Sequence, residues 1–289
     1  MSTGLSNGHS PDSQPDKHPP AASELPPCNR KLKQTEAKKP GVSKIVDWEI
    51  PRKTLHSSIG FLTLYLYVSN GSARNVVVVL TAGLAIIVPC DILRLRSAQF
   101  ERVYERAVGF LMRESEKKST NGVIWYILGV IFALSVYPLD IAVVSILILS
   151  WADTAASTFG RLWGSRTPSL PRRLPILGLP LATRKSLAGF IAAALTGAFT
   201  AIGFWGWVVP TFGTESRYHW IGRATANHGS SESVGGWFGL AVLGVVSGLI
   251  SGVAEALDLD SLDDNLTLPI ISGGCLWGFF KLLDLFTSW

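Results

Sequence analysis

The sequence of 289 residues contains little cysteine and little charge. Its only cysteines, Cys28, Cys90 and Cys275, are widely separated, which supports neither a disulfide framework nor a zinc site. Charged residues make up 16% of the chain and hydrophobic residues 47%, and the mean hydropathy is +0.30. Soluble domains carry about 25% charged residues. The composition therefore excludes a soluble enzyme with a small membrane anchor and indicates a chain that crosses a bilayer several times.

The sequence also lacks the common nucleotide-binding loops. No GxxxxGK[ST] motif, kinase glycine loop or GxGxxG motif occurs. A nucleotide would therefore be bound by a different arrangement. The net charge of +5 does not predict a nucleic-acid partner, because basic residues in a polytopic chain mark cytoplasmic loops.

Half of the 16 prolines lie within the first 54 residues, together with most of the long polar stretches. We expect residues 1–48 to form a disordered cytoplasmic tail, because this segment has no apolar period that could build a core. The basic residues of the tail either bind anionic lipid headgroups or only fix the topology. Residues 49–289 then form one membrane-embedded domain.

Apolar runs fill the rest of the chain and predict an all-α, polytopic transmembrane bundle of about seven spans. We expect these spans at about residues 55–69, 75–93, 122–137, 139–157, 186–209, 235–257 and 266–289. Gly244, Gly248 and Gly252 recur at four-residue spacing in the sixth span, which is typical of close helix packing.

The basic residues between the spans predict the orientation of the chain. The connections at 94–118 and 158–185 carry seven and six lysines and arginines, whereas the 137–140 turn carries none. Cytoplasmic loops contain the excess of basic residues. The tail and the two basic connections are therefore predicted to face the cytoplasm.

Asp153 is the most informative single residue. It follows a strongly apolar run, where a carboxylate is costly unless it is paired, hydrated or bound to a metal. Ala155, Ala156, Ser157 and Gly160 downstream of it are small, and Arg161 comes next. An acid for Mg²⁺, small residues that admit phosphates and an arginine clamp are suited to a polyphosphate. The alternative is that these residues only pack helices.

A second acidic set closes the sixth span. Glu255 still lies within the apolar run, and Asp263 and Asp264 lead into the next span, which makes these three candidates for a metal site. Asp258 and Asp260 are expected to point to water. Because the topology places this loop in the cytoplasm, we expect it near Asp153.

Two basic pairs precede spans on the same face. Arg52 and Lys53 precede the first span, and Arg184, Lys185 and Ser186 open the fifth. A helix that begins at Ser186 would present free N–H groups and the positive end of its dipole to a phosphate. His56, near Arg52, is expected to reach a lipid headgroup.

Four stretches carry a resemblance to a known family: EIPRKTLHSSIGFLTLYLY at 49–67, ADTAASTFGRLWG at 152–164, RKSLAG at 184–189 and EALDLDSLDDNLTLP at 255–269. In combination they resemble the membrane lipid kinases that use CTP. This family includes dolichol kinase, phytol kinase and the fungal CTP-dependent diacylglycerol kinases, and it is related to the phosphatidate cytidylyltransferases.

The resemblance implies transfer of the CTP γ-phosphate to diacylglycerol, which gives phosphatidate and CDP, by a kinase domain in the membranes of the endoplasmic reticulum and nuclear envelope. It also implies roles for four residues: Arg52 and Lys53 hold phosphate charge, Asp153 binds Mg²⁺ (or Ca²⁺) or orients the hydroxyl, and Gly160 leaves room for the nucleotide.

Position alone adds further candidates to the residues that the resemblance implies. Arg161, Arg184, Lys185 and Ser186 are the predicted phosphate-binding residues, and Glu255, Asp263 and Asp264 join Asp153 as predicted metal ligands.

Three other functions are consistent with the same residues. A phosphatidate cytidylyltransferase would use these acids and bases on another phosphorus atom. A polyprenol or dolichol kinase would differ in its acceptor lipid. A transporter with intramembrane carboxylates is disfavoured, because the charged sets gather at one membrane face and no internal repeat occurs.

Overall fold

The computed structural model describes residues 50–109, 112, 116, 119–174, 178–212, 234–259 and 262–287. All of them belong to one compact unit, Val46–Trp289, and the predicted tail at 1–48 lies outside the described residues. The described residues form helices and turns. No β-strand occurs among them, and their only β-structure is isolated bridges. The predicted all-α class is confirmed.

The described chain forms ten α-helices, some of which continue into one another. The first four are α1 (Ile50–Val68), α2 (Ala73–Arg96), α3 (Ala98–Val108) and α4 (Gly122–Val136). Helix α5 (Leu139–Leu147) runs through a π-helical turn, η3 (Ile148–Ala152), into α6 (Asp153–Trp163) and η4 (Gly164–Arg166). Helix α7 (Leu187–Gly203) runs through a second π-helical turn, η5 (Phe204–Val208), into α8 (Val209–Phe212). The last two are α9 (Val234–Ala256) and α10 (Asp264–Thr287).

In the part of the chain that the structure describes, five helical segments are long and apolar enough to cross a membrane: Ala73–Arg96, Leu139–Arg166, Leu187–Phe212, Gly236–Ala256 and Asp264–Leu285. Helix α4 is apolar but shorter, and α1 carries buried basic residues at its start. The five long segments match five of the seven predicted spans in order and position, and α1 and α4 lie where the first and third were expected. The chain is a multi-pass membrane protein.

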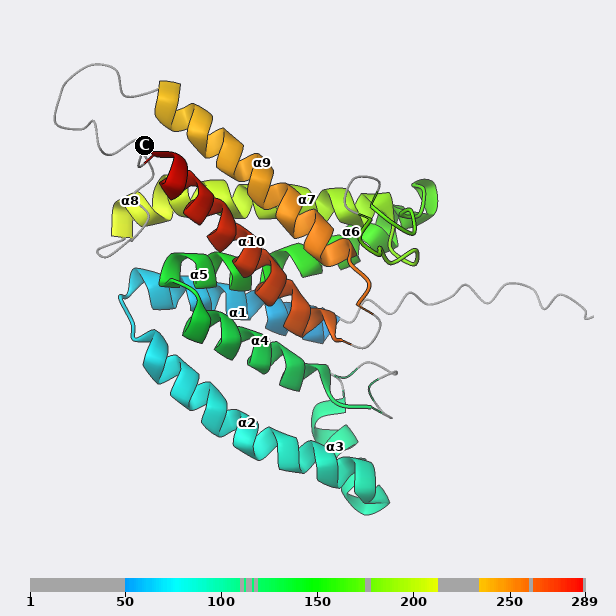
Figure 1. Ribbon diagram of the computed structural model, residues 1–289. Coiled ribbons are helices and arrows are strands. Elements are labelled where there is room, and N and C mark those ends of the chain that lie inside the picture. The colour runs from blue at the N-terminus through cyan, green and yellow to red at the C-terminus, as the bar shows by residue number, and fades with distance from the viewer. Residues whose placement is uncertain are drawn as a thin grey trace, which may run out of the picture. The chain divides into compact units, whose positions relative to one another are not determined.

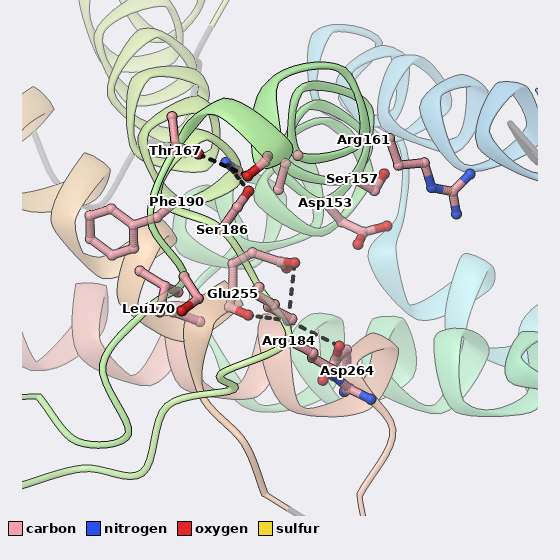
Figure 2. Close-up of a pocket in the computed structure, with 17 residues that line it drawn as sticks. Asp153, Ser157, Arg161, Thr167, Leu170, Arg184, Ser186, Phe190, Glu255 and Asp264 are labelled. Carbon is pink, nitrogen blue, oxygen red and sulfur yellow. Dashed lines mark hydrogen bonds and ion pairs between the residues drawn. The ribbon is translucent and has the colours of Figure 1, made fainter. Parts of the chain in front are cut away.

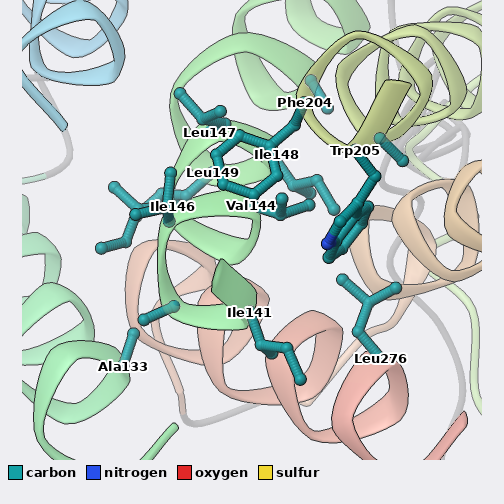
Figure 3. Close-up of a cluster of buried hydrophobic side chains, with 14 of the residues drawn as sticks. Ala133, Ile141, Val144, Ile146, Leu147, Ile148, Leu149, Phe204, Trp205 and Leu276 are labelled. Carbon is teal, nitrogen blue, oxygen red and sulfur yellow. The ribbon is translucent and has the colours of Figure 1, made fainter. Parts of the chain in front are cut away.

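The core of the bundle is the rod formed by α5 and η3. Residues 141–149 are almost completely buried, and they pack against Phe204 and Trp205 of η5 and Leu276 of α10 (Figure 3). In a bilayer, close packing rather than the hydrophobic effect holds helices together. The rod therefore gives a rigid support to Asp153, which begins α6 directly after it.

Helices α7 and α9 cross in close contact and lie side by side in Figure 1. A Cβ at Gly248 would lie 2.7 Å from the carbonyl oxygen of Ala194, and the Ser251 hydroxyl donates a hydrogen bond of 3.0 Å to Ala193 O. The packing role predicted for the glycines of the sixth span is confirmed.

The connection at 167–186 folds back on itself and docks on the end of α9. Leu170 N donates to Lys185 O, and Ala182 N donates to Ala256 O at 2.9 Å. Leu170 and Leu181 form a small apolar cluster with Ala256 and its neighbour Leu257. This docking brings the end of α6, the start of α7 and the α9–α10 turn to one place.

Candidate active site

A pocket of about 560 Å³ lies where these helix ends meet (Figure 2). Its volume falls in the range of small-molecule sites, roughly 300–1,000 Å³. Six charged side chains line it, three basic and three acidic: Arg161, Arg184, Lys185, Asp153, Glu255 and Asp264. The sequence predicted that these separated sets would meet at one membrane face, and the structure brings them to one pocket.

Small residues let α6 and α7 approach until their backbones touch. A Cβ at Gly189 would lie 3.0 Å from Ala156 O and 3.7 Å from the Cα of Gly160. A Cβ at Gly160 would lie 3.5 Å from the hydroxyl of Ser186. Gly160 lines the pocket, and it leaves room for the start of α7.

The prediction of free N–H groups at the start of α7 is wrong, because these donors have acceptors within the chain. Leu187 N donates to Pro168 O at 3.0 Å, Ala188 N donates to the Thr167 hydroxyl at 3.3 Å, and Gly189 N donates to the Ser186 hydroxyl at 3.3 Å. The docked connection and the Ser186 cap satisfy these donors from within the chain. A phosphate here would contact side chains and the helix dipole rather than these amides.

Lys185 pairs with two acids across the pocket. Its Nζ lies 3.1 Å from Glu255 Oε1 and 3.1 Å from Asp264 Oδ2, and it also donates to Glu255 O. Burial lowers the pKa of Lys185, but the charges of Glu255 and Asp264 more than offset this, so the pKa is raised above its ordinary value. Lys185 therefore stays charged and fixes both carboxylates in place.

One carboxylate oxygen of Glu255 has no hydrogen-bond partner among the described residues. Its side chain is 8% exposed, and Oε2 is buried without a hydrogen bond to the described residues. Such an atom is costly unless something binds it. Asp153 lines the same pocket. The pair fits a divalent cation, because Mg²⁺ usually takes one or two carboxylates and completes its shell with phosphates and water.

No group of three His, Cys, Asp or Glu side chains among the described residues forms an ion cage. The donor set therefore suits a cation that arrives with a phosphate rather than one held by protein alone. Asp263 does not line the pocket; its Oδ1 accepts from Asn265 N at 2.9 Å and caps the start of α10.

Arg52 and Lys53 lie beside the pocket rather than in its lining. Arg52 is 6% exposed and approaches Glu116, with 3.9 Å between Nη1 and Oε1. Lys53 Nζ lies 3.4 Å from the hydroxyl of Thr158 on α6. The start of α1 thus lies against the same end of the bundle, as the charge pattern predicted.

The prediction that His56 reaches a lipid headgroup is wrong, because its side chain is buried beside Asp153. His56 is 4% exposed, its Nδ1 lies 3.9 Å from Asp153 Oδ2, and its ring packs on Tyr126 with 4.7 Å between centroids. The Tyr126 hydroxyl is 2.8 Å from the Ser150 hydroxyl. A histidine one turn after Arg52 on the same helix was the available signal, because i and i+4 residues share a face.

Three curated proteins are similar to this chain over 79% of its length, and each is a CTP-dependent diacylglycerol kinase 1. The protein of Eremothecium gossypii is 40% identical with 66% of its own length covered, that of Saccharomyces cerevisiae 39% with 72%, and that of Schizosaccharomyces pombe 38% with 92%. The chain belongs to the family of CTP-dependent diacylglycerol kinases. No model of a protein family matches it, and no solved structure matches it.

Membership of this kinase family gives the pocket a chemical context. A nucleotide dissolved in water and a lipid dissolved in the bilayer must meet where membrane helices end. The pocket lies at such an end, with α6 leading away from the core rod.

Proposed function

We propose that the chain transfers the γ-phosphate of CTP to the free hydroxyl of diacylglycerol, which gives phosphatidate and CDP. The observation that carries the proposal is the pocket at the helix ends, where three basic and three acidic side chains converge in a chain of this kinase family. Phosphoryl transfer depends on positioning and charge neutralisation more than on covalent chemistry. Three basic and three acidic side chains in one pocket are suited to phosphoryl transfer.

The basic side chains take the phosphate charge in this proposal. Arg161 on α6 and Arg184 before α7 both line the pocket, and they form a clamp on the triphosphate. Ser186 offers its hydroxyl proton, since its oxygen already accepts from Gly189 N. Arg52 and Lys53 add positive potential from α1.

Lys185 contributes differently, by holding Glu255 and Asp264 in position. Glu255 and Asp153 are the proposed ligands of Mg²⁺ or Ca²⁺. Asp264 also lines the pocket but stays paired with Lys185, and Asp263 supports the site through its cap on α10. When bound, the cation neutralises charge on the phosphates.

Asp153 orients the acceptor in the proposed reaction. The diacylglycerol oxygen forms a bond to the γ-phosphorus while the bond from that phosphorus to the β,γ-bridging oxygen breaks. The hydroxyl proton goes to the Asp153 carboxylate, and CDP leaves with the bridging oxygen. His56, within ion-pair distance of Asp153, holds this carboxylate in place.

The remaining proposals concern location. We place the pocket at the cytoplasmic face, with the tail at 1–48 in the cytoplasm and residues 49–289 as the kinase domain, in the endoplasmic reticulum membrane and nuclear envelope. The basic connections on that side support this orientation.

Purified protein in lipid nanodiscs, given CTP labelled at the γ-phosphate and diacylglycerol, tests the proposed reaction. We expect label in phosphatidate. Label in pyrophosphate after phosphatidate is supplied would instead indicate a cytidylyltransferase. Faster labelling of dolichol than of diacylglycerol would indicate a polyprenol kinase. No label in any lipid, with movement of an ion across the bilayer, would indicate a transporter.

A further inference from the structure

A second concavity lies between α1, α2 and α4, inside the region that spans the membrane. Its volume is about 230 Å³. Aliphatic side chains from all three helices line it, among them Leu62 on α1, Leu80 on α2 and Leu134 on α4. Thr63 also lines it, but its hydroxyl donates to Ile59 O at 2.9 Å, so its polar group is already satisfied. The groove is therefore apolar along its length.

The groove exists because α2 stands away from α1. Helix α2 packs mainly on α4 and α3, and only 6% of its spanning window is buried. Leu62 at the rim is 65% exposed, whereas Thr63 next to it is buried. The groove thus runs inward from a surface that faces bilayer lipid.

One end of the groove adjoins the active site. Tyr126 lines the groove and also packs on His56, which is within ion-pair distance of Asp153. From Tyr126 the α4 side of the groove continues to Leu134. The eight steps from Tyr126 to Leu134 correspond to about 12 Å of helix at about 1.5 Å per residue. One leaflet of the hydrocarbon core is about 15 Å thick.

We propose that this groove binds an acyl chain of the diacylglycerol substrate, with the glycerol hydroxyl directed past Tyr126 and His56 to Asp153. This proposal rests on the proposed function. Three observations favour a substrate chain as the occupant: the groove is apolar, it matches about one leaflet in length, and its polar end is continuous with the acid that orients the acceptor. The groove would select for acyl length while the pocket selects the nucleotide.

Filling the groove tests this proposal. In Leu80→Trp and Leu62→Trp, an indole enters the groove from α2 and from α1. The matched controls are Val79→Trp and Tyr65→Trp, on the same helices at positions that are 69% exposed and do not line the groove. Each protein is assayed in nanodiscs with dioleoylglycerol and with dihexanoylglycerol, whose short chains fill only part of the groove.

We expect kcat/KM for dioleoylglycerol to fall at least fivefold in the two groove variants and less than twofold for dihexanoylglycerol, with both controls close to wild type. Unchanged kcat/KM for dioleoylglycerol in the groove variants would overturn the proposal. An equal loss of kcat/KM on both substrates, or an equal loss in the control variants, would also overturn it. If the wild type phosphorylates neither diacylglycerol, the proposed function fails, which is a separate result.

Photolabelling identifies the occupant directly. A diacylglycerol with a diazirine in its acyl chain is expected to label peptides that contain residues 59–66, 76–80 or 126–134, and excess dioleoylglycerol should prevent this. Label elsewhere would contradict the proposal. Equal competition by phosphatidylcholine would show that bulk lipid fills the groove and would overturn a substrate site, and crosslinks between two copies of the chain would do the same.

Discussion

His56 on α1 and Asp153 on α6 face each other across the buried side of the candidate active site, with 3.9 Å between Nδ1 and Oδ2. They are separated by 97 positions in the sequence. Asp153 directly follows the buried rod of α5 and η3, which fixes the position of its backbone. Tyr126 packs on the imidazole ring of His56. His56 therefore holds the carboxylate that we assign to the acceptor hydroxyl.

Replacing His56 with Phe keeps the ring packing and removes both nitrogens. The two groups are at ion-pair distance in this structure, and catalytic contacts often tighten to hydrogen bonds only when substrate binds. A hydrogen bond to a charged group contributes roughly 1.5–3 kcal/mol, and about 1.4 kcal/mol corresponds to tenfold in rate. We expect kcat to fall at least tenfold, with less than a threefold change in KM for CTP. Steady-state kinetics and a melting curve check this; unchanged kcat, or a loss that merely follows unfolding, would contradict it.

Lys185→Met removes the ammonium group that pairs with the carboxylates of Glu255 and Asp264. Removing one partner of a buried ion pair costs about 3–5 kcal/mol, and Asp264 is 40% exposed, so we expect the lower end of this range. Thermal melting in nanodiscs should show a clear loss of stability, with Arg173→Met as an exposed control in the same connection. The double variant Lys185→Met with Glu255→Gln should recover part of that stability; no recovery would argue against the pairing.

The raised pKa of Lys185 sets the pH range of this pairing. The stabilisation is fully present below the ordinary lysine pKa of about 10.4, and it is lost as the pH rises through the higher pKa in the folded protein. Melting temperatures between pH 6 and 9 should therefore show no loss that depends on Lys185. A loss of wild-type stability that begins between pH 6 and 9 and is absent in Lys185→Met would contradict the assignment.

The unpartnered Glu255 oxygen predicts a dependence on divalent cations. Chelation with EDTA should abolish transfer, and Mg²⁺ should restore it. Glu255→Gln should raise the Mg²⁺ concentration for half-maximal rate at least tenfold, whereas Asp258→Asn, outside the pocket lining, should not. Full activity in EDTA, or an unchanged Mg²⁺ requirement in Glu255→Gln, would show that Glu255 holds no catalytic cation.

Gly248 tests the close crossing of α7 and α9. A Cβ there would lie 2.7 Å from Ala194 O, so Gly248→Ala must push two backbones apart. Overpacking costs about 1–3 kcal/mol, and we expect a lower melting temperature. Gly203→Ala is the control, because a Cβ at Gly203 meets nothing within 4 Å, and alanine in a helix gains about 0.5–1 kcal/mol over glycine. Equal melting of the two variants would contradict the packing account.

The sequence was sufficient to predict the helical bundle and the convergence of its charges. Apolar runs of span length have few alternative structures in a bilayer, and basic connections assign each helix end to one face. Asp153, Glu255 and Lys185 could therefore be placed near one another without knowledge of any contact.

Details that depend on tertiary contacts could not be predicted. The donors at the start of α7 are satisfied by a connection whose fold the sequence does not reveal. Arg94 belongs to the basic connection at 94–118 that predicts the topology, yet it is 1% exposed and pairs with Asp91 at 2.8 Å. The π-helical turn before Asp153 could not be predicted either, because such turns are rare single-turn bulges inside α-helices.

Asp153→Asn removes one charge from the pocket with almost no change in shape, so it isolates the proposed role of this carboxylate in the transfer. Transfer of labelled γ-phosphate from CTP to dioleoylglycerol is measured in nanodiscs, with Asp258→Asn as the control. We expect transfer by Asp153→Asn to fall by at least about 100-fold, with insertion and melting temperature retained and the control near wild type. Transfer at the wild-type rate by Asp153→Asn would show that Asp153 does not act on the acceptor hydroxyl.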